Sequence, residues 1–138
     1  MVFPIQSASS APTSSAPTAP PLRVATAGEA LFDLIEEPDG RLKPCAGGAV
    51  YNLTRALGLQ GVGTQYLNPL AGDMLGRQLA HGLHEAGVAL AAPTPVRAPS
   101  ALALAALDAE GKASYSFYRD GVADRQVTAA ALTAACAA

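Results

Sequence analysis

Along the chain, short apolar runs with the alternation of strands are interleaved with stretches whose apolar residues recur every three or four positions. The second pattern is typical of a helix with one buried face, and it occurs after Gly48 and again after Asp73. Clusters of glycine and proline separate the runs, as turns require. The predicted elements are, in order, a strand over residues 24–35 with a break at 28–29, an extended segment over 41–44, a helix from 47–48 to 61, a strand over 63–67, a helix over 73–87, a short strand over 88–90, a hairpin over 101–107 and 113–119, and a helix after 128.

Both longer helices carry local sequence signals. Asp73 can cap the second helix by accepting a hydrogen bond from its first free amides, and Gly87 is a typical C-terminal stop. In the first helix Val50, Leu53 and Leu57 fall on one face, which we expect to be buried.

Because strands and helices alternate, we predict an α/β fold built on a largely parallel sheet. The two hairpins do not fit inside such a sheet, and we expect them to form an appendage over one of its edges. Residues 7–20 contain only Ser, Ala, Pro and Thr, which bury too little apolar surface to offset the entropy of ordering. We therefore predict a disordered tail over residues 1–22 and one folded unit over 23–138.

Composition and charge exclude several classes of function. The net charge is −2 and no cluster of Lys and Arg is present, which argues against nucleic-acid binding. No run of 18 apolar residues occurs, so we expect no membrane span. Cys45 and Cys136 lack metal-ligand spacing and fit reduced thiols of a cytoplasmic protein. His81 and His84 have only Glu85 near them, so we expect a solvated helix face rather than a metal site.

Two adjacent glycines, Gly47 and Gly48, precede the first helix. They let the backbone turn sharply and approach a ligand, while the free amides of a helix start attract polar groups. Asn52 follows in the first turn, where its amide can donate and accept. These residues also fit an ordinary turn into a helix with a surface asparagine. A dinucleotide-binding loop is excluded because the third glycine of Gly-x-Gly-x-x-Gly is missing.

A carboxylate and an aromatic–guanidinium segment are the other candidates. Asp33 lies within an apolar run, and a carboxylate at a strand end suits a polyol because it can accept two hydroxyl hydrogen bonds. Phe117 and Arg119 could stack on and bond to a sugar or a sugar acid. Plainer interpretations remain open: an outward-facing strand residue in the first case, and core aromatics beside a solvated arginine in the second.

Together these segments resemble the N-terminal part of PfkB-family, or ribokinase-type, carbohydrate kinases. The resemblance covers residues 24–132, and the fructokinase and 2-keto-3-deoxygluconate kinase branches are the most similar. It rests on five segments in a fixed order, namely Gly28-Glu29 with Asp33, Gly47-Gly48 with Asn52, a helix ending at Gly61, residues 70–76 with Asp73 and Gly76, and Phe117-Tyr118-Arg119 followed by Ala123-Asp124.

The resemblance implies a fold and a substrate site. The fold would be a ribokinase-like three-layer α/β sandwich with a small β lid, truncated here to its N-terminal half. The substrate would be a small-molecule sugar. The residues implied to bind it are Asp33, Gly47, Gly48 and Asn52, together with Phe117 and Arg119 from the lid.

The resemblance also implies transfer of the γ-phosphate of ATP, with Mg²⁺, to a primary alcohol of a ketose-type sugar. The catalytic aspartate and the ATP site would follow a Gly-Ala-Gly-Asp motif in the C-terminal half, and no Gly-x-Gly-Asp occurs in this sequence. We therefore expect no catalytic, cofactor-binding or metal-binding residue here, and no kinase activity from this chain alone. The alternatives are a kinase for 2-keto-3-deoxygluconate or another sugar, and a non-catalytic sugar-binding module that forms a homodimer through its lid.

Overall fold

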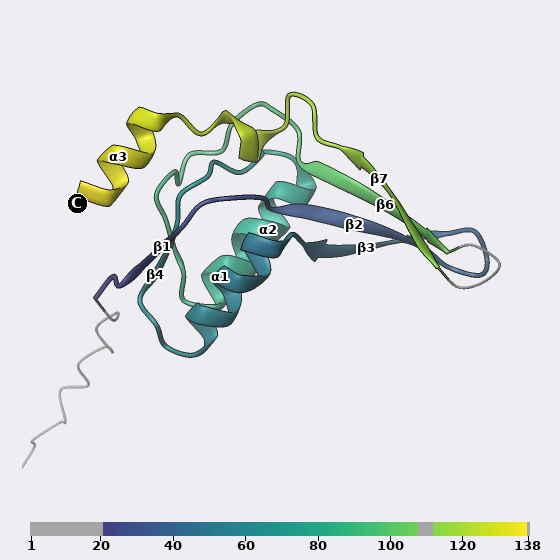
Figure 1. The fold of residues 1–138 in the computed structure, drawn as a ribbon, viewed down its shortest axis with the longest axis horizontal. Helices are drawn as coiled ribbons and strands as arrows, with labels where there is room; N and C mark the ends of the chain where they lie inside the picture. Colours follow the sequence, from purple (N-terminus) through teal and green to yellow (C-terminus); the bar gives the residue numbers. More distant parts are fainter. Residues whose placement is uncertain (1–20, 108–111, 138) are drawn as a thin grey trace, which may run out of the picture.

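The structure, a computed structural model, describes residues 21–107 and 112–137 of the chain. The disordered tail predicted over residues 1–22 lies almost wholly outside these residues, and so does most of the loop between the strands of the last hairpin. Within the described residues the predicted α/β architecture is present, divided into a body that carries the helices and a projecting blade of strands (Figure 1).

The body contains a small parallel sheet with the strand order β1-β4-β5. Its strands are β1 (Val24–Thr26), β4 (Thr64–Tyr66) and β5 (Ala89–Leu90). Two helices accompany them, α1 (Ala49–Leu59) against β4, and α2 (Met74–Glu85) against β5 and α1. The predicted parallel sheet is therefore confirmed, although each of its strands is short.

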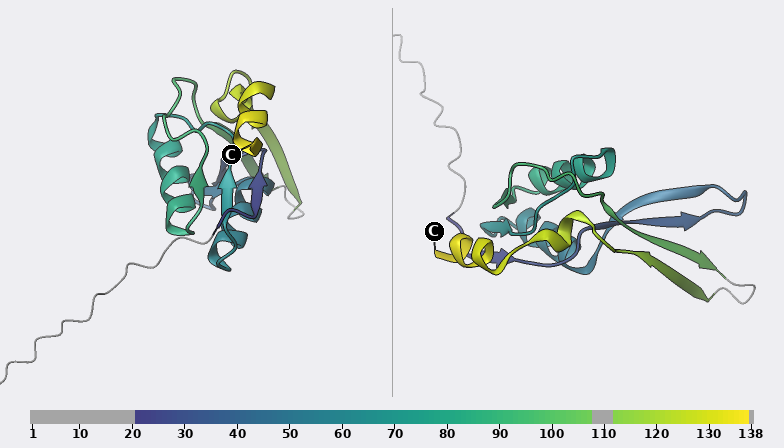
Figure 2. Two further views of the ribbon diagram at one scale, coloured as in Figure 1. Left: turned by 90° about the vertical axis from the view of Figure 1, so that its left-hand side faces the viewer. Right: turned by 90° about the horizontal axis from the view of Figure 1, so that it is seen from above.

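The blade is a second, four-stranded sheet with the order β3-β2-β6-β7. It is made of two antiparallel hairpins joined side by side through parallel pairing of β2 with β6. The four strands are β2 (Leu31–Glu36), β3 (Leu42–Gly47), β6 (Ala101–Leu107) and β7 (Ala113–Tyr118). Figure 2, seen from above, shows both hairpins leaving the body in the same direction. The prediction of hairpins outside the parallel sheet is confirmed.

The end of the described chain returns to the body. A 3₁₀ turn, η1 (Ala123–Gln126), follows the blade, and a final helix, α3 (Ala129–Ala137), comes after it. Thr128 Oγ1 accepts a hydrogen bond from Ala131 N at 3.1 Å, which makes Thr128 the cap that the sequence predicts.

The body has a well-packed apolar core between the helices and the short strands. Its largest buried side chains include Tyr51 of α1, Tyr66 of β4, and Leu79 and Leu83 of α2, each at most 1% exposed. Phe32 extends this core to the root of the blade. The α2 boundaries follow the predicted signals, since Asp73 Oδ1 accepts a hydrogen bond from Gly76 N at 2.7 Å and Gly87 has a φ of 74°.

The predicted inner face of α1 is wrong in one respect. Leu53 is 54% exposed, while Tyr51 and Thr54 are the buried residues of this helix. Thr54 is tolerated in the core because its hydroxyl is paired with that of Thr26 at 2.7 Å. The helix is therefore rotated relative to the face that its aliphatic residues alone predict.

Candidate functional site

A cavity of about 230 Å³ lies at the junction of the body and the blade. Its walls come from four segments: the bend between β1 and β2, strand β2, the start of α1, and strand β7. The residues that line it are Glu29, Leu31, Asp33, Gly48, Ala49, Asn52, Tyr115 and Phe117. We call this cavity the cradle.

Four of the six predicted substrate-binding residues line the cradle, and they come from three distant stretches of sequence. Gly48 and Asn52 belong to the body, while Asp33 on β2 and Phe117 on β7 belong to the blade. Gly47 is adjacent to Asp33, and Arg119 is absent from the lining. The structure thus brings these residues together, while their role as sugar ligands stays a prediction.

Asp33 points its carboxylate toward the end of β3. A side chain on Gly47 would place its Cβ 2.5 Å from Asp33 Oδ2 and would displace the carboxylate from this position. Among the residues that the structure describes, none donates a hydrogen bond to this carboxylate. Its oxygens are therefore available to accept hydroxyl protons from a ligand.

The start of α1 explains the second glycine. Gly48 has a φ of 104°, a conformation that L side chains rarely adopt, and an added Cβ would lie 2.9 Å from the carbonyl oxygen of Glu29. No side chain of Gly48 can cap the helix, and the Glu29 carboxylate does so instead, accepting a hydrogen bond from Ala49 N at 3.0 Å. Asn52 lies one turn further on and is exposed toward the cradle.

The blade contributes an aromatic wall. Tyr115 and Phe117 stand on the same face of β7 with their rings stacked and the ring centroids 6.0 Å apart. Both are more than half exposed, at 57% and 60%, and Tyr118 is 60% exposed as well. Phe117 and Tyr118 are therefore not the core aromatics of the plainer interpretation. Tyr115 and Phe117 form an apolar wall of the cradle, whose other walls carry the polar Asp33 and Asn52, an arrangement that favours a ligand with one apolar face.

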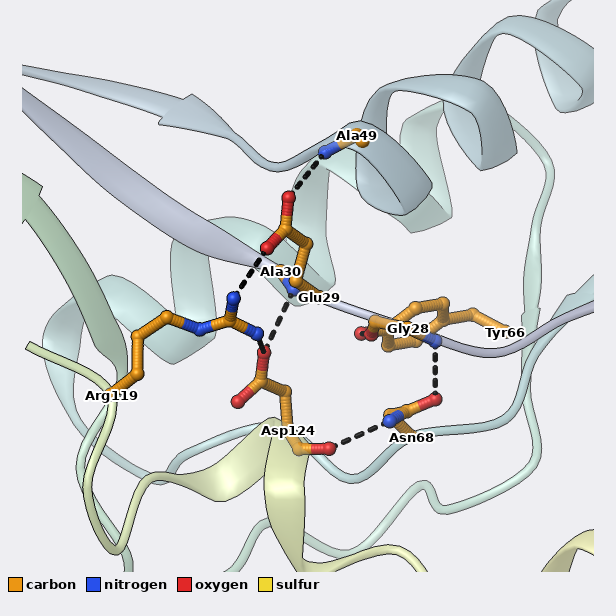
Figure 3. Close-up of polar contacts among 8 residues, drawn as sticks. All are labelled: Gly28, Glu29, Ala30, Ala49, Tyr66, Asn68, Arg119 and Asp124. Carbon is orange, nitrogen blue, oxygen red and sulfur yellow. Dashed lines mark hydrogen bonds and ion pairs between the residues drawn. The ribbon is translucent and has the colours of Figure 1, made fainter. Parts of the chain in front are cut away.

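Arg119, directly after β7, is held by two carboxylates (Figure 3). Its Nη1 lies 2.8 Å from Glu29 Oε2, and its Nη2 lies 3.9 Å from Asp124 Oδ2. Arg119 is therefore neither solvated nor part of the cradle lining. It lines a second cavity of about 330 Å³, between β7, β6 and the segment leading to η1.

Asp124 carries the most deeply buried carboxylate among the described residues, at 4% exposure. Its Oδ2 accepts a hydrogen bond from Ala30 N at 3.2 Å, and its backbone oxygen accepts one from Asn68 Nδ2 at 2.6 Å (Figure 3). Burial raises the pKa of the Asp124 carboxyl above its ordinary value, although the Ala30 amide and the Arg119 guanidinium oppose the change. Asp124 Oδ1 and Arg119 Nε are both buried without a partner among the described residues.

Asn68 continues this network to the strand bend. Its Oδ1 accepts a hydrogen bond from Gly28 N at 2.8 Å, while the hydroxyl of Tyr66 donates to Gly28 O at 2.6 Å. The bend that carries Glu29 is thus held at both the amide and the carbonyl of Gly28 by partly buried hydrogen bonds.

Sequence reasoning assigned no role to Glu29, Asn68 or Asp124. Glu29 and Asp124 belong to segments that matched the resemblance, which was the only available signal. Their contacts join residues 20 to 94 positions apart, and no local pattern encodes them.

Other candidate chemistry gains no support. Within residues 21–107 and 112–137 no group of three His, Cys, Asp or Glu side chains is arranged to hold a metal ion. His81 instead faces Glu85 one turn away, at 3.3 Å. The described helices include none long and apolar enough to cross a membrane.

Comparisons with known proteins point in one direction. No family model matches the chain. A fructokinase of Rhizobium leguminosarum bv. trifolii is 35% identical over 109 residues, which cover 76% of this chain and 33% of the relative. The chain therefore spans about a third of the length of that curated relative.

Solved structures agree with the sequence comparison. Two crystal structures of fructokinase from Xylella fastidiosa, one with bound ATP, are 35% and 33% identical, each with a TM-score of 0.71. Each match covers 78% of this chain, and it covers 37% of the first fructokinase chain and 36% of the second. A PfkB protein from Polaromonas sp. JS666, 20% identical with a TM-score of 0.69 over 80% of this chain and 39% of its own, shares the fold.

Proposed function

Because this chain belongs to the PfkB-type carbohydrate kinases, we propose that it forms the sugar-binding part of an ATP-dependent kinase that phosphorylates a primary alcohol of a ketose-type sugar. The observation that carries this proposal is the cradle. A free carboxylate, a diglycine bend, an asparagine amide and an aromatic wall, drawn from separate stretches of sequence, surround one cavity. Its composition suits a polyol, which offers hydroxyl groups on its edges and C–H groups on its faces.

Each residue has a definite part in this proposal. Asp33 accepts hydrogen bonds from two sugar hydroxyls, and Asn52 bonds a further one. Gly48 keeps the helix start close to the ligand, and Gly47 leaves room for the Asp33 carboxylate. Phe117 covers the apolar face of the sugar from the lid, which is formed by the four strands of the blade.

No observation on the described residues supports a site for ATP or Mg²⁺ in them. These residues offer no cluster of metal ligands, and the Gly-x-Gly-Asp motif is absent from the sequence. We therefore assign no step of phosphoryl transfer to them. In the proposal, the catalytic aspartate and the nucleotide site come from sequence beyond this chain, and the chain alone binds sugar without phosphorylating it.

A second candidate, a non-catalytic sugar-binding module that dimerises through its lid, is favoured by the exposed aromatics of the blade. Tyr115 and Phe117 on one face of β7 and Tyr118 on the other are each at least 57% exposed, and exposed aromatic side chains are common at protein–protein interfaces. The same lid could also serve the complete kinase as a homodimer. The candidates differ in whether the complete natural protein that contains this sequence consumes ATP.

The test is a binding measurement with a matched pair of substitutions. D-fructose is titrated by calorimetry into the complete natural protein, into Asp33→Asn and into Asp39→Asn. Asp39 lies on the exposed turn between β2 and β3, so its substitution changes the charge equally without touching the cradle. We expect Asp33→Asn to weaken binding at least tenfold, because one charged acceptor for two hydroxyl groups is lost.

The same samples are then assayed for ADP release with D-fructose and ATP. Sugar-dependent ADP release supports the kinase, and sugar binding without ADP release supports the non-catalytic module. Absence of binding to D-fructose and to a panel of other ketoses, aldoses and sugar acids would contradict both.

A further inference from the structure

The 3₁₀ turn η1 lies against the root of the blade, where β2 and β6 begin and β7 ends. Ala123 N donates a hydrogen bond to Pro99 O at 2.9 Å, two residues before β6. Val122, directly before η1, is 3% exposed and forms one buried cluster with Leu31 of β2 and two alanines of β6. The turn is thus attached to β6 by its backbone and to β2 by packing.

The carboxylate of Asp124 reaches the two strands on either side of β6. Its Oδ2 accepts a hydrogen bond at 3.2 Å from Ala30 N, directly before β2. The same oxygen lies 3.9 Å from Nη2 of Arg119, directly after β7 (Figure 3). Strands β2 and β7 are not paired with each other, since β6 lies between them. One buried oxygen atom therefore connects these two strands at the root of the blade.

These contacts lead to three walls of the cradle. Strand β2 carries Asp33, and β7 carries Phe117. Arg119 also pairs with Glu29 Oε2 at 2.8 Å, and Glu29 Oε1 accepts the hydrogen bond from Ala49 N that caps α1. Asp124 itself lies outside the cradle lining, so any effect that it has on a ligand passes through the positions of these walls.

Asp124 is in turn held by the body. Its backbone oxygen accepts a hydrogen bond from Asn68 Nδ2 at 2.6 Å, and Asn68 Oδ1 accepts one from Gly28 N at 2.8 Å. Asn68 follows β4, the central strand of the parallel sheet. The packed body is thereby connected through Asp124 to the blade, which has little core of its own.

Stability does not explain the charge of Asp124. Its side chain is almost wholly buried, and this burial raises the pKa of its carboxyl, which the Ala30 amide and the Arg119 guanidinium do not offset. A carboxyl group whose pKa is raised by folding makes the folded protein less stable at pH values above that pKa. In some proteins a buried charge of this kind is retained because it specifies one geometry, not because it adds stability.

From these contacts we propose that Asp124 is a positioning residue of the sugar site: by joining Ala30 and Arg119 to one turn held by the body, it fixes β2, β7 and the start of α1 around the ligand without touching it. The inference rests on the proposed sugar-binding function. It concerns the affinity for sugars in general and not the choice among them.

The test measures dissociation constants for D-fructose by calorimetry, in the complete natural protein and in graded variants of Asp124. Asp124→Asn keeps an oxygen for the Ala30 amide but loses the charge that faces Arg119, and we expect it to weaken binding at least threefold. Asp124→Ala loses both contacts and should weaken binding at least tenfold. Asp120→Asn removes the same charge from an exposed turn just before η1 and should leave the affinity unchanged.

Further variants distinguish positioning from simple destabilisation. Leu83→Ala removes a fully buried side chain of the body, outside the cradle, so the thermal midpoint should fall while the folded protein binds D-fructose as before. Asp124→Asn should show the reverse, with weaker binding and a midpoint at pH 7 no lower than that of the natural protein.

A double-mutant cycle tests the path through Arg119. Arg119→Gln should weaken D-fructose binding at least threefold by itself, because β7 loses its tie to Glu29 and Asp124. In the protein that carries both Arg119→Gln and Asp124→Asn, the loss of affinity should be at least twofold smaller than the product of the separate losses, since both substitutions break the same contact.

The outcomes separate this inference from the function it rests on. If neither D-fructose nor the panel of other sugars binds to the natural protein, the proposed function fails and this inference fails with it. If the natural protein binds D-fructose and the Asp124 variants bind it as tightly as Asp120→Asn does, the inference alone is overturned. Separate losses that multiply in the cycle overturn it as well. Should Asp124→Ala fail to fold, Asp124→Asn and the cycle decide in the same way.

Discussion

The body and the blade of this molecule are stabilised in different ways. In the body, side chains from α1, α2 and the short parallel strands are almost completely buried, and the strands themselves are only two or three residues long. In the blade, the strands are six or seven residues long and each is paired with a neighbour along its length, while large apolar residues such as Leu42 and Phe117 are about half exposed. Side-chain packing is therefore the main stabilising interaction in the body, and backbone hydrogen bonding is the main one in the blade.

This difference explains where the candidate site lies. The rigid body can hold Asn52 in a fixed position, while the blade, which carries Asp33 and Phe117, has little core of its own and can adjust around a ligand. Only its root is packed, where Leu31, Ala101, Ala103 and Val122 form a small buried cluster. The cradle sits at this root, between the fixed and the adjustable region.

The largest contrast between the two regions should appear when a leucine is truncated in each. Leu83 of α2 is 0% exposed, and Leu83→Ala should lower the unfolding free energy of the protein by about 2–5 kcal/mol, because the substitution leaves a cavity in a packed core. Leu42→Ala in β3, where the side chain is 47% exposed, should change it by less than about 1 kcal/mol. Urea denaturation followed by circular dichroism measures both, and equal losses would contradict the division.

The second largest effect on the unfolding free energy should come from Asp73, which links α2 of the body to the start of β6 in the blade. Asp73 caps α2 through Gly76 N and also accepts hydrogen bonds from Ser100 N and Oγ, each at 2.8 Å, just before β6. Asp73→Ala removes all three acceptor contacts, and we expect a loss of about 1–3 kcal/mol in unfolding free energy. Ser100→Ala, which removes only the hydroxyl, serves as the graded control and should lose less.

Asp73 also predicts a pH dependence. Burial alone would raise the pKa of its carboxyl, but the hydrogen bonds from Gly76 and Ser100 outweigh burial and lower it below its ordinary 3.8. A lowered folded-state pKa means that the stabilisation is present above this value and is lost as the pH falls through the folded-state pKa. The difference in unfolding free energy between the natural protein and Asp73→Asn should therefore shrink below about pH 4. A difference that grows on acidification would contradict this.

Substituting two glycines with positive φ compares the junction of body and blade, at Gly48, with the tip of the blade, at Gly40. Gly48→Ala forces an unfavourable conformation and pushes on the Glu29 carbonyl, whereas Gly40→Ala, at a φ of 78° in the β2–β3 turn, meets no atom within 4 Å. Both should lose about 1–2 kcal/mol of unfolding free energy from backbone strain. Only Gly48→Ala should also weaken sugar binding, by about tenfold, as measured by calorimetry. Equal sugar affinities would show that the junction is not part of the site.

The sequence predicted what is locally encoded. The ends of α2 follow from Asp73 and Gly87, and the β6–β7 hairpin follows from two β-like runs around a short loop. Four cradle residues were identified because a glycine, a carboxylate, an amide and an aromatic ring carry recognisable chemistry. The inner face of α1 was predicted wrongly at Leu53, since a buried Thr54 satisfied by Thr26 is invisible to a hydrophobicity pattern.

Partnerships across long sequence separations could not be predicted. Glu29 lies 20 residues from the Ala49 amide that it caps, and Arg119 reaches it from the other end of the folded chain. The residues next to a side chain in the sequence do not indicate which charged group will lie beside it in the folded protein. For this reason Arg119 was expected to face the ligand, whereas the structure pairs it with Glu29 and Asp124.

Phe117→Ala should have the smallest effect on stability of these substitutions and still weaken sugar binding clearly. Phe117 is 60% exposed, so Phe117→Ala removes little buried surface and should change the unfolding free energy by less than about 0.5 kcal/mol. Its ring nevertheless lines the cradle, and its loss should weaken D-fructose binding about fivefold or more, because an apolar wall for the sugar C–H groups is gone. Tyr118→Ala, equally exposed on the opposite face of β7, is the matched control and should leave binding unchanged. If both substitutions weaken binding alike, the aromatics act through association of lids rather than as a wall of the cradle, and the concentration dependence of sedimentation would then distinguish the two variants from the natural protein.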